Sequence, residues 1–135
     1  LYKMINKNYN ITKIEGVIWN ALITGNVVTS AKLFMGSRPT GPAETNFIVA
    51  GIATDVMDKC AYGTFRVFID IYAKDLANGR KDAGTLSTLT DKVFDILPIS
   101  SYPFYCDIYS TFAVDDGAGY HINKIYLDCI VTQTT

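Results

Sequence analysis

The chain offers few side chains that could carry out acid–base chemistry. His121 is its one histidine and begins a predicted strand, and no nucleophile signature such as G-x-S-x-G occurs. A lone histidine at a strand end is typical of a surface residue. Glutamate occurs only at positions 15 and 44, so a tuned acid–base pair would have to come from aspartates, and no pair is singled out by spacing. The sequence therefore predicts a non-enzymatic protein with no catalytic residue.

Three short patterns resemble binding sites but are incomplete. The DDG sequence at 115–117 lacks the alternating acids and late glutamate of a calcium loop, and is typical of a hairpin turn. The GRK sequence at 79–81 precedes a predicted helix, where an anion can bind, but no phosphate loop surrounds it. Cys60, Cys106 and Cys129 follow no metal-ligand spacing. We expect no cofactor, no metal, and three reduced and buried cysteines.

Length and charge limit the domain number and the partners. A chain of 135 residues suffices for one core, so residues 1–135 are predicted to form a single domain. The net charge is −1 and the cations are scattered, which disfavours nucleic-acid recognition. Charges interrupt every apolar run before the roughly 20 residues that span a bilayer. We expect no membrane segment, and no signal peptide in LYKMINKNYN.

Apolar spacing predicts two amphipathic helices. TKIE at 12–15 has the pattern of a capping box, and apolar residues then recur at helical spacing up to Gly25. We expect a helix over residues 13–24, ended by Gly25 in the left-handed conformation. The second helix begins at a cap, Asp82 or Thr85, and a proline ends its apolar pattern.

Extended patterns separated by turn residues predict strands. Gly51 lies inside one of them and indicates a bulge or a close backbone approach. Because most of these strands follow one another through hairpins, they are expected to pair antiparallel. The predicted fold is α+β, an antiparallel sheet of about five strands with two helices packed on one face. The strands are expected at residues 27–35, 47–56, 64–73, 104–114 and 121–132.

The last hairpin predicts a register. With its turn centred in DDGAG (115–119), Cys106 lies opposite Cys129 on the face under the helices, and Asp107 lies opposite Asp128 on the other face. Two directly opposed aspartates are unfavourable. Either a bulge in the turn shifts the register by one residue and reverses the faces, or a lysine or arginine of another chain meets the pair.

The face away from the helices carries aromatic side chains, where a solvated sheet would carry lysine, threonine or glutamate. Aromatics among paired charges are typical of a subunit interface, and a large exposed patch is unusual on a monomer. The alternative is that a long loop or the N-terminal segment covers this face. The predicted subunit-interface residues are Arg66, Phe68, Asp70, Tyr72, Tyr109, Lys124 and Tyr126.

Together with the first amphipathic helix, four later features resemble the tail terminator proteins of long-tailed phages, also called tail-completion or minor tail proteins. They are the strand FRVFIDIYAKD (65–75), the polar loop NGRKDAG (78–84), the helix TLSTLTDKVFDIL (85–97) and the closing strand INKIYLDCIVTQ (122–133). The resemblance covers about residues 12–133 and rests on element order and residue character.

This resemblance implies a structural protein that forms a homo-oligomeric ring, expected to be a hexamer. Such a ring caps the tail tube, ends its polymerisation and joins the head–neck connector. The implied partners are further copies of the chain, the tail tube protein and the head–tail connector protein. The implied location is the virion tail or neck, after assembly in the cytoplasm of the host bacterium. The loops facing these partners would present Arg38, Thr40, Glu44, Asn78, Arg80 and Lys81.

Other functions stay open at this level. A related neck or tail-completion ring would share the resemblance, and so would an adaptor module of a bacterial contractile system. A small-molecule-binding or enzymatic α+β domain would instead use the aromatic face as a pocket, with residues 75–84 as its lid.

Overall fold

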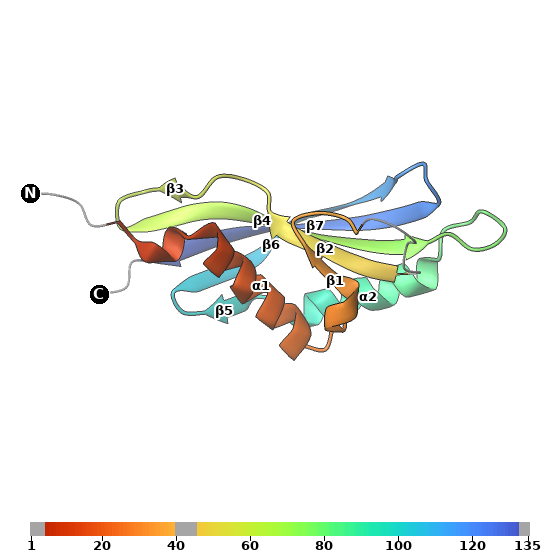
Figure 1. The fold of residues 1–135 in the computed structure, drawn as a ribbon, viewed down its shortest axis with the longest axis horizontal. Helices are drawn as coiled ribbons and strands as arrows, with labels where there is room; N and C mark the ends of the chain where they lie inside the picture. The colour runs from red at the N-terminus through yellow and green to blue at the C-terminus, as the bar shows by residue number, and fades with distance from the viewer. Residues whose placement is uncertain (1–4, 40–45, 133–135) are drawn as a thin grey trace, which may run out of the picture.

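The computed structural model describes residues 5–39 and 46–132. Two short 3-10 helices, Lys7–Tyr9 and Ser30–Lys32, accompany the main elements. The main elements (Figure 1) are α1 (Ile11–Thr24), β1 (Leu33–Met35), β2 (Asn46–Ile52), β3 (Met57–Asp58), β4 (Tyr62–Lys74), α2 (Ala83–Asp95), β5 (Ile99–Ser101), β6 (Phe104–Asp115) and β7 (Tyr120–Thr132).

One sheet contains all the described strands. Its order is β1-β2-β4-β7-β6-β5, and β3 pairs with β4. β1 runs parallel to β2, whereas the other pairs are antiparallel. The α+β class is confirmed, but the predicted antiparallel sheet of about five strands is wrong, because the sheet is mixed and has seven strands. β3 and β5 escaped prediction because two or three residues are too few to show alternation.

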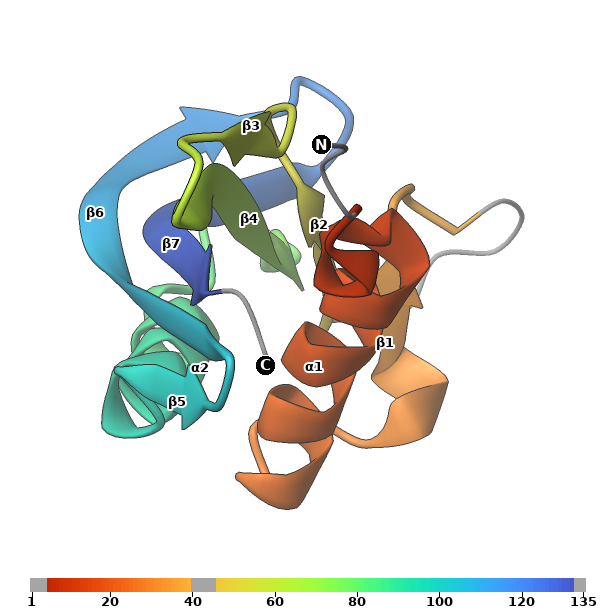
Figure 2. The ribbon, with the colours of Figure 1, turned by 90° about the vertical axis from the view of Figure 1, so that its left-hand side faces the viewer.

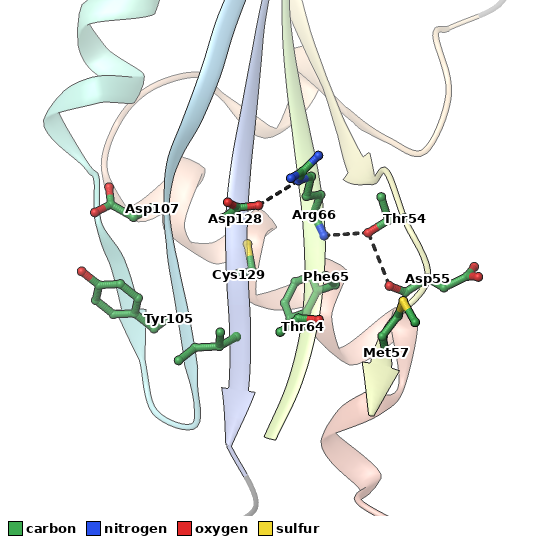
Figure 3. A pocket seen from close by; sticks show the side chains of 11 residues that line it. Thr54, Asp55, Met57, Thr64, Phe65, Arg66, Tyr105, Asp107, Asp128 and Cys129 are labelled. Carbon is green, nitrogen blue, oxygen red and sulfur yellow. Dashed lines mark hydrogen bonds and ion pairs between the residues drawn. The ribbon is translucent and has the colours of Figure 1, made fainter. Parts of the chain in front are cut away.

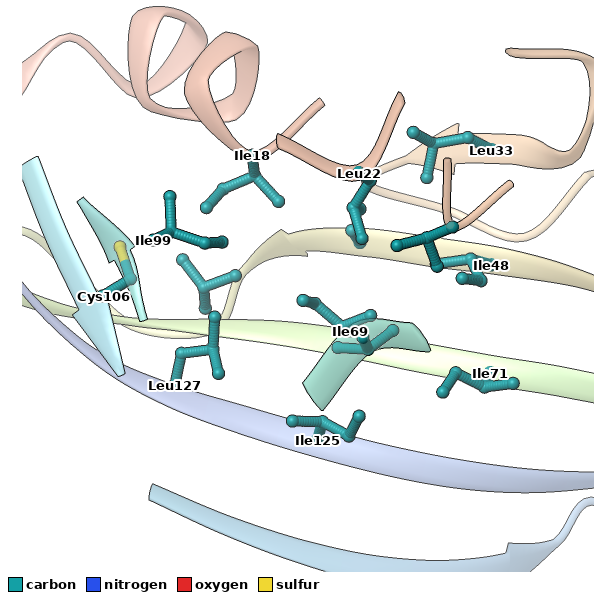
Figure 4. Packing of buried hydrophobic residues seen from close by; sticks show 14 of the residues in the cluster. Ile18, Leu22, Leu33, Ile48, Ile69, Ile71, Ile99, Cys106, Ile125 and Leu127 are labelled. Atoms are coloured by element: carbon teal, nitrogen blue, oxygen red, sulfur yellow. The ribbon is translucent and has the colours of Figure 1, made fainter. Parts of the chain in front are cut away.

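The sheet curls around both helices, which lie on its concave face (Figure 2). Ile18 and Leu22 of α1 point into the core from one side, and Ile69 of β4 and Ile125 of β7 meet them from the sheet (Figure 4). Leu86, Leu89 and Val93 of α2 complete the same apolar cluster. Burial of large aliphatic side chains, at about 1.5–3 kcal/mol each, holds this layer together.

The ends of α1 differ from the prediction in detail. Asn10 caps the helix in place of a capping box, because its side chain accepts a hydrogen bond from the Thr12 amide at 3.0 Å. Gly25 has a φ of −76° and is therefore not left-handed, whereas Asn26 is, with a φ of 57°. Gly25 is required for another reason: a Cβ there would lie 2.4 Å from Cγ2 of Ile96.

The last hairpin starts in the predicted register and then departs from it. Cys106 pairs with Cys129 and Asp107 with Asp128, but a β-bulge after Ile108 shifts the rest of β6 by one residue. The shift lies inside the strand and not in the turn, so the two aspartates stay on the face away from the helices. The interpretation that a bulge in the turn reverses the faces is therefore wrong. Within the chain, Arg66 meets Asp128 of the pair, and the contact with another chain stays a prediction.

Candidate interaction surface on the outer sheet face

The outer face, which is the sheet face away from the helices, has a small core of its own. Phe47, Val49 and Tyr120 are buried there. The Phe47 ring stacks on the Tyr72 ring with centroids 4.6 Å apart. Phe68 belongs to the same group, and its ring leaves room only for hydrogen at Gly51, where a Cβ would lie 3.0 Å away. The close approach predicted at Gly51 is confirmed, and it occurs without a bulge. The outer cluster consists of Phe34, Phe47, Val49, Phe68, Tyr72 and Tyr120.

Arg38 covers this outer cluster. Its guanidinium lies 4.8 Å from the centroid of the Tyr120 ring and 5.4 Å from that of Tyr72, within cation–π range. It also donates to Asp116 at 3.0 Å. A loop residue therefore covers the outer cluster. The sequence had left open that a long loop covers the whole outer face, and the structure shows such cover over this part of it.

Asp70 and Lys124 form an ion pair beside the cluster. Asp70 is only 5% exposed, and its Oδ2 accepts from the Lys124 ammonium at 2.7 Å. Its Oδ1 has no hydrogen-bond partner among the described residues. Burial raises the pKa of Asp70, and the hydrogen bond and charge of Lys124 oppose this effect.

Arg66 joins three strands farther along the outer face. Its Nε donates to Asp128 on β7 at 2.8 Å, and this hydrogen bond is the main cause that raises the pKa of Arg66. The guanidinium carbon lies 3.7 Å from the centroid of the Tyr109 ring on β6. The Arg66 amide donates to Thr54 Oγ1 at 2.9 Å. Arg66 thus offsets the charge of one of the two facing aspartates, Asp128.

An exposed apolar strip runs along β6. Tyr109 is 51% exposed, and Ile108 and Phe112 are each 46% exposed. Phe112 stacks on Tyr126 of β7 with centroids 5.7 Å apart. The predicted register assigned Phe112 to the face under the helices. The bulge moves it outward, and nothing in the sequence signals that bulge.

A groove of about 690 Å³ lies at the β3 end of the outer face (Figure 3). Its floor is the backbone of β4 and β7, and Met57 and Tyr105 stand on opposite sides. Asp55, Asp107 and Asp128 give it an acidic rim. The sequence gave no indication of this groove, because its walls come from four segments that only the fold brings together.

The predicted partner-facing loops differ in how far the structure describes them. Asn78 accepts from the Arg80 amide at 3.0 Å in an exposed turn, and Lys81 is exposed beside it. Thr40 and Glu44 lie outside the described residues. The GRK sequence does not form an anion site, because the Asp82 carboxylate accepts from the Thr85 amide at 3.1 Å and occupies the start of α2. The Asp82 cap is one of the two predicted and is confirmed.

The other reactive side chains lie apart from the outer face residues described above. His121 Nδ1 lies 2.6 Å from Asp75 Oδ1. Within residues 5–39 and 46–132, no group of histidine, cysteine and acidic side chains could hold a metal ion, and neither helix is long and apolar enough to cross a bilayer. Cys106 and Cys129 are buried as predicted. The prediction for Cys60 is wrong, because it lies exposed in the β3–β4 turn.

No protein-family model matches the chain, and no curated protein matches it. Among solved structures, a chain from the virion of a native gene transfer agent (GTA) particle superposes with a TM-score of 0.65. The two are 14% identical, and the match covers 92% of this chain and 98% of that chain. The two chains share one fold.

Within this shared fold the outer face has two parts. The outer cluster is filled by its own side chains and by Arg38, and it includes Phe68 and Tyr72 of the predicted interface. The other part, on β6 and β7, leaves Tyr109 and Phe112 exposed. The sequence had suggested, as an alternative, a small-molecule pocket lined by the aromatic face. The residues of that pocket would belong to the outer cluster, whose rings pack against one another.

Proposed function

We propose that this protein is a structural component of a phage or phage-like virion. The observation that supports this proposal is the fold it shares with a chain of a GTA virion, over 92% of its length. More finely, we propose that it acts as a tail terminator: a homo-oligomeric ring that ends the tail tube and meets the connector. The sequence resemblance to that family points the same way.

A ring subunit needs a lateral surface that binds its neighbour and two different end surfaces. The exposed part of the outer face supplies candidate lateral contacts, since Tyr109, Phe112 and Tyr126 present aromatic area beside Arg66. Aromatic side chains and arginine are the residues that dominate such interfaces. The ends of the molecule differ: the β4–α2 loop and the β6–β7 turn lie at one end, and β3, the start of α1 and the end of β7 lie at the other (Figure 1).

The oligomeric state tests the proposal. We expect light scattering of the purified protein, or negative-stain images in the presence of tail tubes, to reveal rings of about six copies. The double variant Tyr109→Asp/Phe112→Asp should remain folded but lose the ring. Tyr102→Asp is the control, because Tyr102 is also an exposed aromatic residue but lies in the β5–β6 turn. A protein that stays monomeric and ignores tail tubes would refute the ring function.

A further inference from the structure

β6 presents an unpaired edge. β5 pairs only with its first residues, Phe104 to Cys106. From Asp107 to Asp115, β6 pairs with β7 on one side, and no other strand of the described chain lies against it. Backbone N–H and C=O groups on such an edge are a template for another strand.

This edge carries little of the usual protection against pairing. Proteins guard exposed edges with charges, prolines, bulges or very short strands. No residue from 108 to 114 is charged or proline, and the segment is rich in β-branched and aromatic side chains. The bulge after Ile108 is the one protective feature in β6. The stretch from Ser110 to Val114 continues beyond it in regular pairing with β7.

We infer that this edge receives an extended segment of a second protein by β-strand addition. The segment is uncharged at its centre and carries a lysine or arginine near each end. The chemistry at the two ends of the edge supports this choice. Asp107 closes one end on the outer face, and Asp115 closes the other end on the helix face, because the bulge lies between them. The two basic residues of the segment therefore point to opposite faces. A strand with basic ends would pair with both, as opposite charges on adjacent strands stabilise pairing.

The same charges disfavour a second copy of this chain as the occupant. Two β6 edges paired antiparallel in full register would place Asp107 of each copy opposite Asp115 of the other, so both ends would carry like charges. The opposite edge of the sheet, β1, spans only Leu33–Met35 and would leave most of the β6 edge uncovered. The inference does not depend on the ring function.

A labelled peptide tests the inference directly. The probe is fluorescein-Lys-Thr-Val-Thr-Phe-Thr-Val-Lys, whose two lysines are seven positions apart and so point to opposite faces of the strand. Fluorescence anisotropy measures its binding to the full chain. We expect it to bind at least about tenfold more tightly than the same peptide with glutamate at both ends. A copy that is N-methylated at alternate residues cannot form the ladder of backbone hydrogen bonds and should not bind. Amide exchange in residues 108–114 should slow when the lysine peptide binds.

Charge-neutral variants locate the effect. Asp107→Asn/Asp115→Asn keeps the side-chain acceptors that bind the Ile108 and Gly117 amides, and thermal unfolding verifies its fold. Its preference for lysine over glutamate ends should fall to less than about threefold. Equal binding of the two peptides to the wild type, binding of the N-methylated copy, or exchange protection elsewhere would overturn the inference. If amide exchange at this edge slows as the protein concentration rises, with no peptide present, the edge binds a second copy of the chain and the inference is overturned.

Discussion

Lys124 and Asp70 are joined by a contact of 2.7 Å between ammonium and carboxylate, on a face of the sheet where most neighbours are aromatic. The pair is asymmetric, because Asp70 is buried and the side chain of Lys124 is 23% exposed. Removal of Lys124 therefore has a different consequence from removal of Asp70. Loss of the lysine leaves the buried Asp70 carboxylate without its counter-charge, whereas loss of the aspartate leaves a lysine cation that can reach water.

A double-mutant cycle should reveal this asymmetry. Lys124→Met is expected to lower the free energy of unfolding at pH 7 by roughly 3 kcal/mol, because a buried charge loses its partner. Asp70→Asn/Lys124→Met should recover a large part of that loss. Urea unfolding monitored by circular dichroism measures both. A double variant as unstable as Lys124→Met alone would contradict the assignment of the penalty to Asp70.

The pH dependence of Asp70→Asn has a defined sign. The folded-state pKa of Asp70 is raised above its ordinary value of 3.8, so the folded state binds this proton more tightly than the unfolded state. The contribution of Asp70 to stability therefore decreases as the pH rises from about 3.8 through the raised pKa. The stability of Asp70→Asn relative to the wild type should increase over that window and level off above it. Thermal unfolding from pH 3.5 to 7 tests this, and parallel curves would refute it.

Two glycines of the first helix, Gly16 inside α1 and Gly25 at its C-terminal end, should respond oppositely to alanine. Gly25→Ala places a Cβ 2.4 Å from Cγ2 of Ile96 and 2.9 Å from the Ala21 oxygen, and should cost about 1–3 kcal/mol. Gly16→Ala meets nothing within 4 Å and should stabilise the helix by about 0.5–1 kcal/mol. Chemical unfolding compares the two. If Gly25→Ala leaves the free energy of unfolding unchanged, α1 and Ile96 can move apart readily.

Two phenylalanines on the outer face should separate stability from assembly. Phe47→Ala removes a fully buried ring and is expected to cost about 3–5 kcal/mol. Phe112→Ala removes an exposed aromatic side chain and should change the free energy of unfolding by less than about 1 kcal/mol. The same variant should weaken the proposed homo-oligomeric ring. Unfolding curves and light scattering on the same samples provide both values. Equal losses of stability would contradict the division of the outer face into two parts.

Thiol labelling should distinguish the cysteines. Cys60 is exposed, whereas the hydrogen bond of the Cys129 thiol to Cys106 and burial raise the pKa of Cys129, and only the thiolate reacts. Native protein should therefore incorporate one equivalent of iodoacetamide, located at Cys60 by peptide mass. Denatured protein should incorporate all three. Labelling of Cys129 in the native state at the rate of Cys60 would show that the β6–β7 hairpin opens.

The sequence carried enough information for the elements with strong periodicity. Both helices, the long strands β4, β6 and β7, and the Asp82 cap follow from local patterns that the fold leaves unchanged. The parallel pairing of β1 with β2 did not follow, because it depends on where a long loop returns the chain. β3 and β5 are held by their neighbours and have no pattern of their own.

The site was harder to predict than the fold, for two physical reasons. The bulge after Ile108 changes the face on which every later residue of β6 lies, so Phe112 moves to the outer surface. Burial on the outer face depends on Arg38, which reaches Tyr72 and Tyr120 from a distant part of the sequence. Aromatic content alone could not separate a second core from a contact surface.

The contact between Arg38 and Asp116 links the loop after β1 with the β6–β7 turn, 78 residues away in sequence. Those two segments therefore behave as one mechanical unit. Loss of the Arg38 guanidinium would therefore free the Asp116 carboxylate and remove the cover from Tyr72 and Tyr120 together.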